Sequence, residues 1–218
     1  MVHMRQNGVL TGDVIGSTDL KDWRSVSSEI NRLLKDLNKE FRDSILMDFH
    51  VTAGDEFQVA LENPTSLLEA YRSLRLRMPV AFRCGMGIGG IEPHQGRDPS
   101  MRGQAFYRAR RSIEVAKRLD RRSYIMTSSS STRRDKALNA LLAFIDDIEV
   151  HWTERQRTLS TYYLLKGNPS LKAIATEFRV TPQSVSQTLR AARVTLIEEG
   201  ENAMFSLAGE TERGSSLK

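Results

Sequence analysis

The order of apolar patterns in the first half of the chain constrains its fold most. Residues 8–15 form an apolar run typical of a buried strand, and the segment 22–46 places its apolar residues at helical spacing. Two short strand-like runs follow at 50–53 and 57–61, and Gly54-Asp55 joins them as a hairpin turn. The chain is therefore predicted to begin with a strand, a helix and a β-hairpin.

A second helix and a further strand complete this pattern. A helical segment begins at Asn63-Pro64, and residues 80–91 follow it as a glycine-rich strand. The resulting order, β-α-β-β-α-β, is the split βαβ or ferredoxin-like arrangement. A helix over 103–119 and a short strand over 124–127 are expected next. We predict an α+β fold whose first domain spans residues 1–131.

Two aspartates end the apolar runs on neighbouring strands. Asp13 closes the first strand, and Asp55 lies at the tip of the hairpin. If the strands lie side by side, both carboxylates converge on a divalent metal, Mg²⁺ or Mn²⁺, which prefers oxygen ligands. Taken singly, each aspartate is more often a turn or capping residue than a metal ligand. Together they predict a metal site.

The backbone beside these aspartates is suited to phosphate. A glycine next to each carboxylate lets phosphate oxygens approach closely, and the N-terminus of a following helix favours anions. A nucleoside triphosphate or a related nucleotide is the expected ligand. The predicted phosphate-binding residues of this loop and hairpin are Val14, Ile15, Gly16, Ser17 and Gly54.

Charge points to the same class of partner. The net charge is +5, and basic residues crowd between Arg97 and Arg134. Phosphates, as nucleotide or nucleic-acid backbone, are the natural counterpart of such a stretch. A solvated helix face is the alternative interpretation.

Cysteine content and hydropathy indicate the cellular location to expect. Cys84 is the only cysteine, so neither an intramolecular disulfide nor a cysteine-based zinc cluster can form. A reducing, cytoplasmic location is expected. No run approaches the roughly 20 apolar residues of a membrane span, so no membrane partner is expected.

Beyond the first domain the pattern becomes helical. Thr153, Ser170 and Thr181 are each typical capping residues, and a turn of about four residues separates the last two helices. That plan is typical of a helix-turn-helix, whose second helix enters the DNA major groove. We predict a helical connector, a small all-α helix-turn-helix domain and a polar tail, at residues 132–151, 152–199 and 200–218.

The second helix of this pair has side chains suited to double-stranded DNA. Glutamine suits adenine, arginine suits guanine, and serine is permissive. A small helical bundle that serves dimerisation is the alternative. The predicted DNA-binding residues are Lys172, Gln183, Ser184, Ser186, Gln187, Arg190 and Arg193.

Several motifs resemble those of known families. Residues 13–18 are similar to the first metal motif of class III nucleotide cyclases, and residues 53–57 resemble both their second metal hairpin and the GGDEF signature of diguanylate cyclases. Residues 83–89 and 103–111 resemble the strand and helix motifs that follow in class III enzymes. With its C-terminal helices, the whole chain most resembles the SatD family.

This resemblance carries implications for the site. Class III cyclases assemble their sites between two such domains, which implies a homodimer. Arg111 falls at the arginine that would be catalytic in an active enzyme, and Arg108 or Arg111 would bind the outer phosphate. Val51 and Tyr107, however, stand where those enzymes carry a base-selecting lysine and a ribose-orienting asparagine.

Three functions are compatible with these features. The first is a DNA-binding transcription regulator that senses a nucleotide and a metal through its cyclase-like domain. The second is an active magnesium-dependent cyclase or nucleotidyl transferase that makes a cyclic or linear nucleotide. The third is a scaffold that binds only other proteins. The departures at Val51 and Tyr107 favour the regulator.

Overall fold

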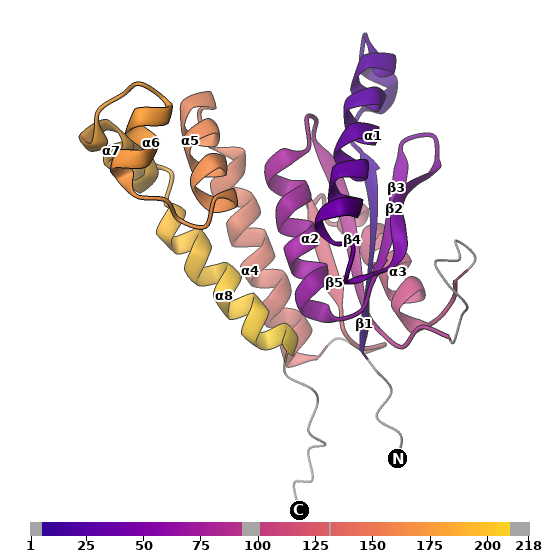
Figure 1. Cartoon of the computed structure of the whole chain (residues 1–218). Helices are drawn as coiled ribbons and strands as arrows, with labels where there is room; N and C mark the ends of the chain where they lie inside the picture. The colour runs from indigo at the N-terminus through magenta and orange to yellow at the C-terminus, as the bar shows by residue number, and fades with distance from the viewer. Residues whose placement is uncertain (1–5, 93–100, 131, 210–218) are drawn as a thin grey trace, which may run out of the picture.

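The computed structural model describes residues 6–92, 101–130 and 132–209, which contain a five-stranded sheet and eight α-helices (Figure 1). A short 3₁₀ turn covers Ser17–Asp19. The strands are β1 (Asn7–Val14), β2 (Ile45–Ala53), β3 (Glu56–Leu61), β4 (Phe82–Gly89) and β5 (Ser123–Met126). The helices are α1 (Trp23–Glu40), α2 (Pro64–Arg77), α3 (Gln104–Arg118), α4 (Arg133–Val150), α5 (Glu154–Leu165), α6 (Leu171–Glu177), α7 (Pro182–Ala191) and α8 (Val194–Gly209).

The sheet has the strand order β2-β3-β1-β4-β5. β1 lies antiparallel to both β3 and β4, and β5 is added parallel to β4. This is the order that the split βαβ pattern predicts for the first four strands. The predicted mixed α+β class is confirmed.

The two faces of the sheet are covered differently. Leu10 and Met86 belong to the main hydrophobic core with the buried residues of α1 and α2, whereas Val9 packs with Ala105 and Ala109 of α3. Alternation of side chains along β1 explains the division. One face therefore carries α1 and α2, and the other carries α3.

Glycines in β4 let α3 lie directly on the strand. A Cβ on Gly85 would come within 2.3 Å of the Ile113 nitrogen, and one on Gly87 within 2.2 Å of the Ala105 oxygen. Side chains at these positions would push the helix away. The glycine spacing thus sets how closely α3 approaches the sheet.

The boundary between the first helix and the hairpin was predicted wrongly. The helical segment expected over 22–46 ends at Glu40, and β2 already begins at Ile45 rather than at residue 50. Ile45, Met47 and Phe49 are buried at alternate positions, which is the period of a strand. Although helical spacing is expected up to residue 46, this segment forms a strand because it pairs with β3.

The C-terminal helices also differ from prediction. The helix expected to run from Thr181 to Leu196 or beyond is broken at Arg193, whose φ of 56° is left-handed, and α8 begins at the next residue. Residues 200–209, predicted as tail, are helical, because Glu201 and Met204 are buried against the rest of the molecule. Residues 210–218 lie outside the described residues, as does Arg97 of the basic stretch.

One hydrophobic cluster runs through both halves of the described chain. It includes core residues of the sheet and of α5–α8, and α8 packs along α4 and α2 (Figure 1). Within the described ranges, no helix has the combination of length and apolarity that a membrane crossing requires.

Candidate functional site

The predicted metal ligands lie at one end of the sheet. Asp13 is the last but one residue of β1 and lies opposite Glu56 of β3 and Arg83 of β4 in the strand register. Asp55 precedes Glu56 in the hairpin turn, and its carbonyl accepts a hydrogen bond from the Val14 nitrogen at 3.4 Å. We call Asp13, Asp55 and Glu56 the acidic end.

Each carboxylate of the acidic end already has a partner. Asp13 Oδ2 lies 2.6 Å from Lys117 Nζ of α3, and Asp55 Oδ2 accepts a hydrogen bond from Ser17 Oγ. Glu56 Oε2 lies 3.3 Å from Arg110 Nη1, also of α3. Cations of α3 therefore reach two of the three carboxylates.

Arg83 faces Asp13 in the register but is used elsewhere. Its Nε donates to the Arg121 carbonyl at 2.9 Å, and its Nη2 lies 3.0 Å from Asp120 Oδ1. Asp120 itself has a left-handed φ of 50° in the turn after α3. Arg83 therefore fixes this turn, and Lys117 is left as the cation at Asp13.

The predicted phosphate loop is only partly available. The Val14 nitrogen donates to Asp55, and the Ile15 nitrogen donates to the Ala81 carbonyl at 2.9 Å. These two amides serve the sheet and cannot also hold phosphate. Gly16, whose φ of 68° suits glycine, and Ser17 are the remaining members of the loop.

Gly54 is required for its backbone conformation rather than for space. Its φ is 61°, and a Cβ built there would meet nothing within 4 Å. The hairpin turn is therefore open on its outer side. That leaves room beside Asp55 for a ligand.

The structure does not bring Arg108 to the acidic end of its own chain. Arg108 Nη1 donates to the carbonyls of Ile88 and Thr127. Ile88 pairs with Gly8, five residues along β1 from Asp13 and so roughly 17 Å away. Arg108 ties α3 to β4 and to the residue that follows β5.

Arg111 lies on another side of α3. It lines a cleft of about 320 Å³ with Arg118, Tyr124, Ser128 and Ser129, between α3 and the end of β5. Tyr107, one turn earlier on the helix, is 65 % exposed. The α3 side chains paired with the acidic end are instead Arg110 and Lys117.

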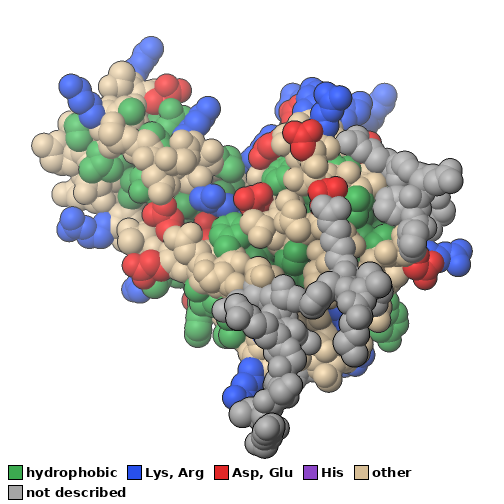
Figure 2. All heavy atoms as spheres, turned by 60° about the horizontal axis from the view of Figure 1, so that its bottom comes forward, with side chains coloured by type: hydrophobic (Ala, Val, Ile, Leu, Met, Phe, Trp, Pro, Cys, Tyr) green, Lys and Arg blue, Asp and Glu red, His purple; other side chains and the backbone are tan. Residues whose placement is uncertain are grey.

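The predicted DNA-binding residues gather on α7 and its neighbours. Gln183, Gln187 and Arg190 are exposed and share one face at helical spacing, whereas Val185 and Leu189 are buried. In Figure 2, Lys and Arg side chains project at the left edge, the side on which α6 and α7 lie in Figure 1. α7 therefore presents a polar face outward and an apolar face inward.

The other predicted contacts vary in exposure. Lys172 of α6 is exposed, and so is Arg193 at the break before α8. Ser184 and Ser186 are half-buried, and Ser184 Oγ accepts a hydrogen bond from Arg155 Nη2 of α5 at 2.6 Å. Arg155 was not predicted, and it brings a further exposed cation to the start of α7.

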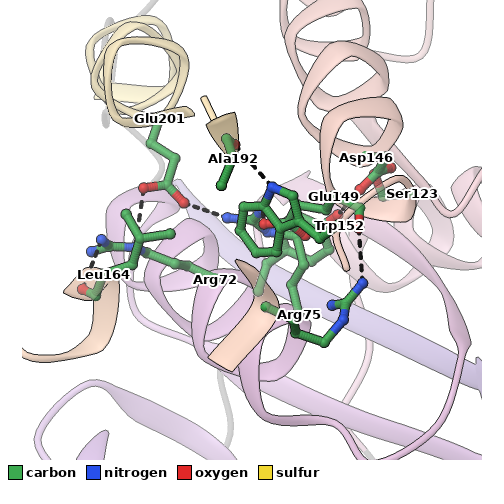
Figure 3. A network of polar contacts seen from close by, with 11 residues as sticks. Arg72, Arg75, Ser123, Asp146, Glu149, Trp152, Leu164, Ala192 and Glu201 are labelled. Carbon is green, nitrogen blue, oxygen red and sulfur yellow. Dashed lines mark hydrogen bonds and ion pairs between the residues drawn. The ribbon is translucent and has the colours of Figure 1, made fainter. Parts of the chain in front are cut away.

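A buried polar network that the sequence did not predict joins the two halves (Figure 3). Arg75 of α2 forms ion pairs with Glu149 of α4 and Glu201 of α8, and Arg72 Nε lies 3.1 Å from Glu201 Oε2. Asp146 accepts hydrogen bonds from the hydroxyls of Tyr71 and Ser123. We call Arg72, Arg75, Asp146, Glu149 and Glu201 the buried junction.

Burial dominates the electrostatics of this junction. Burial alone would lower the pKa of Arg75, but Glu149 and Glu201 outweigh it and hold that pKa above its ordinary range. Burial raises the pKa of both Glu149 and Glu201, although Arg75 acts in the opposite direction. No pattern in the sequence pairs these residues, which lie on three different helices.

The acidic end can hold a metal only if further ligands come from outside the protein. Within the described residues, no three His, Cys, Asp or Glu side chains converge as a metal cluster. Asp13 and Asp55 supply the hard oxygen donors that Mg²⁺ and Mn²⁺ prefer, and the remaining ligands would be water or phosphate oxygens. The residues fit a metal that arrives together with a phosphate ligand.

One comparison with known proteins shows a family. The family model described as the SatD family matches residues 9–205. A search of curated proteins found no match. The solved structures that resemble the chain include a bacterial light-regulated adenylyl cyclase, at 10 % identity and a TM-score of 0.43 over 56 % of this chain and 76 % of that one. A second structure of such a cyclase has 12 % identity and a TM-score of 0.40 over 56 % and 43 %. Likenesses this distant say nothing of a reaction or a ligand.

Proposed function

The chain belongs to the SatD family, and from that premise we propose that it is a DNA-binding transcription regulator whose cyclase-like part senses a nucleotide with a divalent metal. The observation that carries the proposal is the outward polar face of α7, formed by Gln183, Gln187 and Arg190. Such a face suits base edges in the major groove. Lys172 and Arg193 would bind phosphates beside it.

The sensory part of the proposal rests on the acidic end. Asp13 and Asp55 would hold Mg²⁺ or Mn²⁺, and the backbone at Gly16 and Ser17 would contact phosphate. When bound, the metal would neutralise phosphate charge. The ion pair between Lys117 and Asp13 favours ligand binding over turnover, because it engages a carboxylate that catalysis would need.

A homodimer is part of the proposal. Arg111 is exposed on α3 and does not line the acidic end of its own chain. A phosphate contact by Arg111 therefore requires a second copy whose acidic end meets that side of α3. Two copies would also pair two α7 helices on a roughly palindromic DNA site.

DNA binding is tested by fluorescence anisotropy on the DNA upstream of the chain's own gene, at several salt concentrations. Arg190→Ala should weaken binding roughly 5- to 150-fold if Arg190 contacts a base. Lys172→Ala should weaken binding uniformly across sequences and reduce the salt slope by about one. Arg24→Ala, an exposed arginine on α1, is the matched control. Equal binding by all these variants would contradict the regulator.

Ligand sensing is tested by thermal shift with each ribonucleoside triphosphate, with and without Mg²⁺. We expect a metal-dependent rise of the melting temperature that Asp13→Asn and Asp55→Asn abolish, because both carboxylates hold the ion. Pyrophosphate release in the same mixtures, lost in those variants, would instead support the nucleotidyl transferase. No shift with any triphosphate would remove the sensory role.

A further inference from the structure

The cations that neutralise the acidic end come from the protein itself. Lys117 Nζ lies 2.6 Å from Asp13, and Arg110 lies 3.3 Å from Glu56. Both are on α3, seven residues apart and so on one face of the helix. Two of the three carboxylates of the acidic end are therefore already paired with a cation of the protein.

The Asp13–Lys117 pair is partly shielded from water. The Asp13 side chain is only 17 % exposed and that of Lys117 is 45 % exposed. Gly85 and Gly87 let the backbone of α3, which carries Lys117, lie directly on β4. A metal that uses Asp13 must therefore compete with Lys117.

Charge limits how many metal ions this end accepts. Sites that clamp the attacking and leaving oxygens of a phosphoryl transfer use two metals about 4 Å apart. Here, the two built-in cations leave about one negative charge on the acidic end, so a single divalent ion already makes it positive. A second ion would meet repulsion from both the first ion and Lys117.

We propose that Lys117 takes the place of one of two metal ions at the acidic end, so that the site accepts a single divalent ion between Asp13 and Asp55, and Lys117 competes with that ion at Asp13. This inference rests on the proposed function, since it assumes that Asp13 and Asp55 face a metal and a phosphate ligand. The site is therefore built to bind a nucleotide rather than to convert it.

The test measures Mn²⁺ binding by electron paramagnetic resonance, which counts free ions without requiring any activity. The full chain is titrated as wild type, Lys117→Gln and Lys117→Arg. Lys136→Gln, an exposed lysine on α4, is the control for the loss of one positive charge. Circular dichroism establishes that each variant is folded.

The wild type should bind one Mn²⁺ at the acidic end. Lys117→Gln should bind Mn²⁺ roughly three- to fivefold more tightly than Lys136→Gln, as expected for release of a partly exposed ion pair. Lys117→Arg keeps the cation and should stay close to wild type. Adding Asp13→Asn to Lys117→Gln should remove the gain, because it depends on the freed carboxylate.

Two results would overturn the inference in distinguishable ways. If Lys117→Gln and Lys136→Gln bind Mn²⁺ equally while the wild type binds measurably, Lys117 does not compete, and the proposed nucleotide site stands. Binding of two Mn²⁺ per wild-type chain, both lost with Asp13→Asn, would likewise show that Lys117 does not replace a metal ion. If no variant binds Mn²⁺, the metal site of the proposed function fails as well.

Discussion

The acidic end and the buried junction are built from the same pairing of basic side chains with carboxylates, but in different surroundings. At the acidic end, Lys117 and Arg110 are 45 % and 61 % exposed. At the junction, the side chains of Arg75 and Glu149 are 2 % and 0 % exposed. Water can replace a lost partner only at the acidic end. Exposed pairs can therefore be exchanged for a ligand, whereas buried pairs hold helices together.

Breaking the junction should give the largest effect. Arg75→Met leaves the Glu149 and Glu201 carboxylates buried without their main partner, which costs about 3–5 kcal/mol of unfolding free energy. Urea denaturation measures the loss. Arg77→Met, which removes the exposed pair with Glu40, is the neighbouring control and should cost about 1 kcal/mol or less.

A companion variant separates lost charge from lost packing. Arg75→Met combined with Glu149→Gln and Glu201→Gln removes the uncompensated charges, so it should recover a large part of the stability. If Arg75→Met costs no more than Arg77→Met, the junction is not what joins α2 to α4 and α8.

Disturbing the close contact of α3 with β4 should give the next largest loss of stability. Gly85→Ala places a Cβ within 2.3–2.8 Å of backbone atoms of Ala109 and Ile113, so the helix must shift. We expect a loss of about 1–3 kcal/mol in urea denaturation. Gly209→Ala, where a Cβ meets nothing within 4 Å, is the control. Equal stability of the two variants would mean that β4 does not fix α3.

The close contact between α3 and β4 also shows which features could be predicted from the sequence and which could not. The strand order and the adjacency of Asp13 and Asp55 follow from local periodicity and from the hairpin turn. The partner of Asp13 does not, because Lys117 is one of many basic residues on a stretch whose helical face is set by contact with Gly85 and Gly87. Because the same contact fixes which face of α3 meets the sheet, it also directs Arg111 to a different side of the helix.

The junction was missed for a related reason. Arg75, Glu149 and Glu201 are far apart in the sequence, and each is buried only because three helices meet around it. Periodicity describes one helix at a time and therefore cannot pair them. The break at Arg193 was missed likewise, since only the packing of α8 on α4 and α2 requires the chain to turn there.

A smaller effect is expected in the pH dependence of the unfolding free energy, through the buried Cys84 thiol. Burial, and secondarily Asp146 of the junction, raise the pKa of the Cys84 thiol well above its ordinary value. The folded state then keeps a proton that the unfolded chain loses above about pH 8.5, so stability falls as pH rises through that range.

The loss of unfolding free energy between pH 8 and pH 9.5 should be about 1 kcal/mol larger for the wild type than for Cys84→Ala. Urea denaturation at both pH values measures the difference in slope, which does not depend on the constant cost of the substitution. Parallel slopes would show that the thiol titrates alike in the folded and unfolded chain.

The smallest effect is expected at the exposed pair of Arg110 with Glu56. Arg110→Gln should cost at most about 1 kcal/mol of unfolding free energy, because water solvates both groups when the pair is lost. The cost should disappear at 1 M salt, where the screening length is about 3 Å, whereas the cost of Arg75→Met should persist because its pair is buried. Urea denaturation of both variants at low and high salt makes the comparison. A salt-independent loss of several kcal/mol in Arg110→Gln would mean that the acidic end is a structural joint like the junction, and a poor place for a ligand to exchange with the protein's own cations.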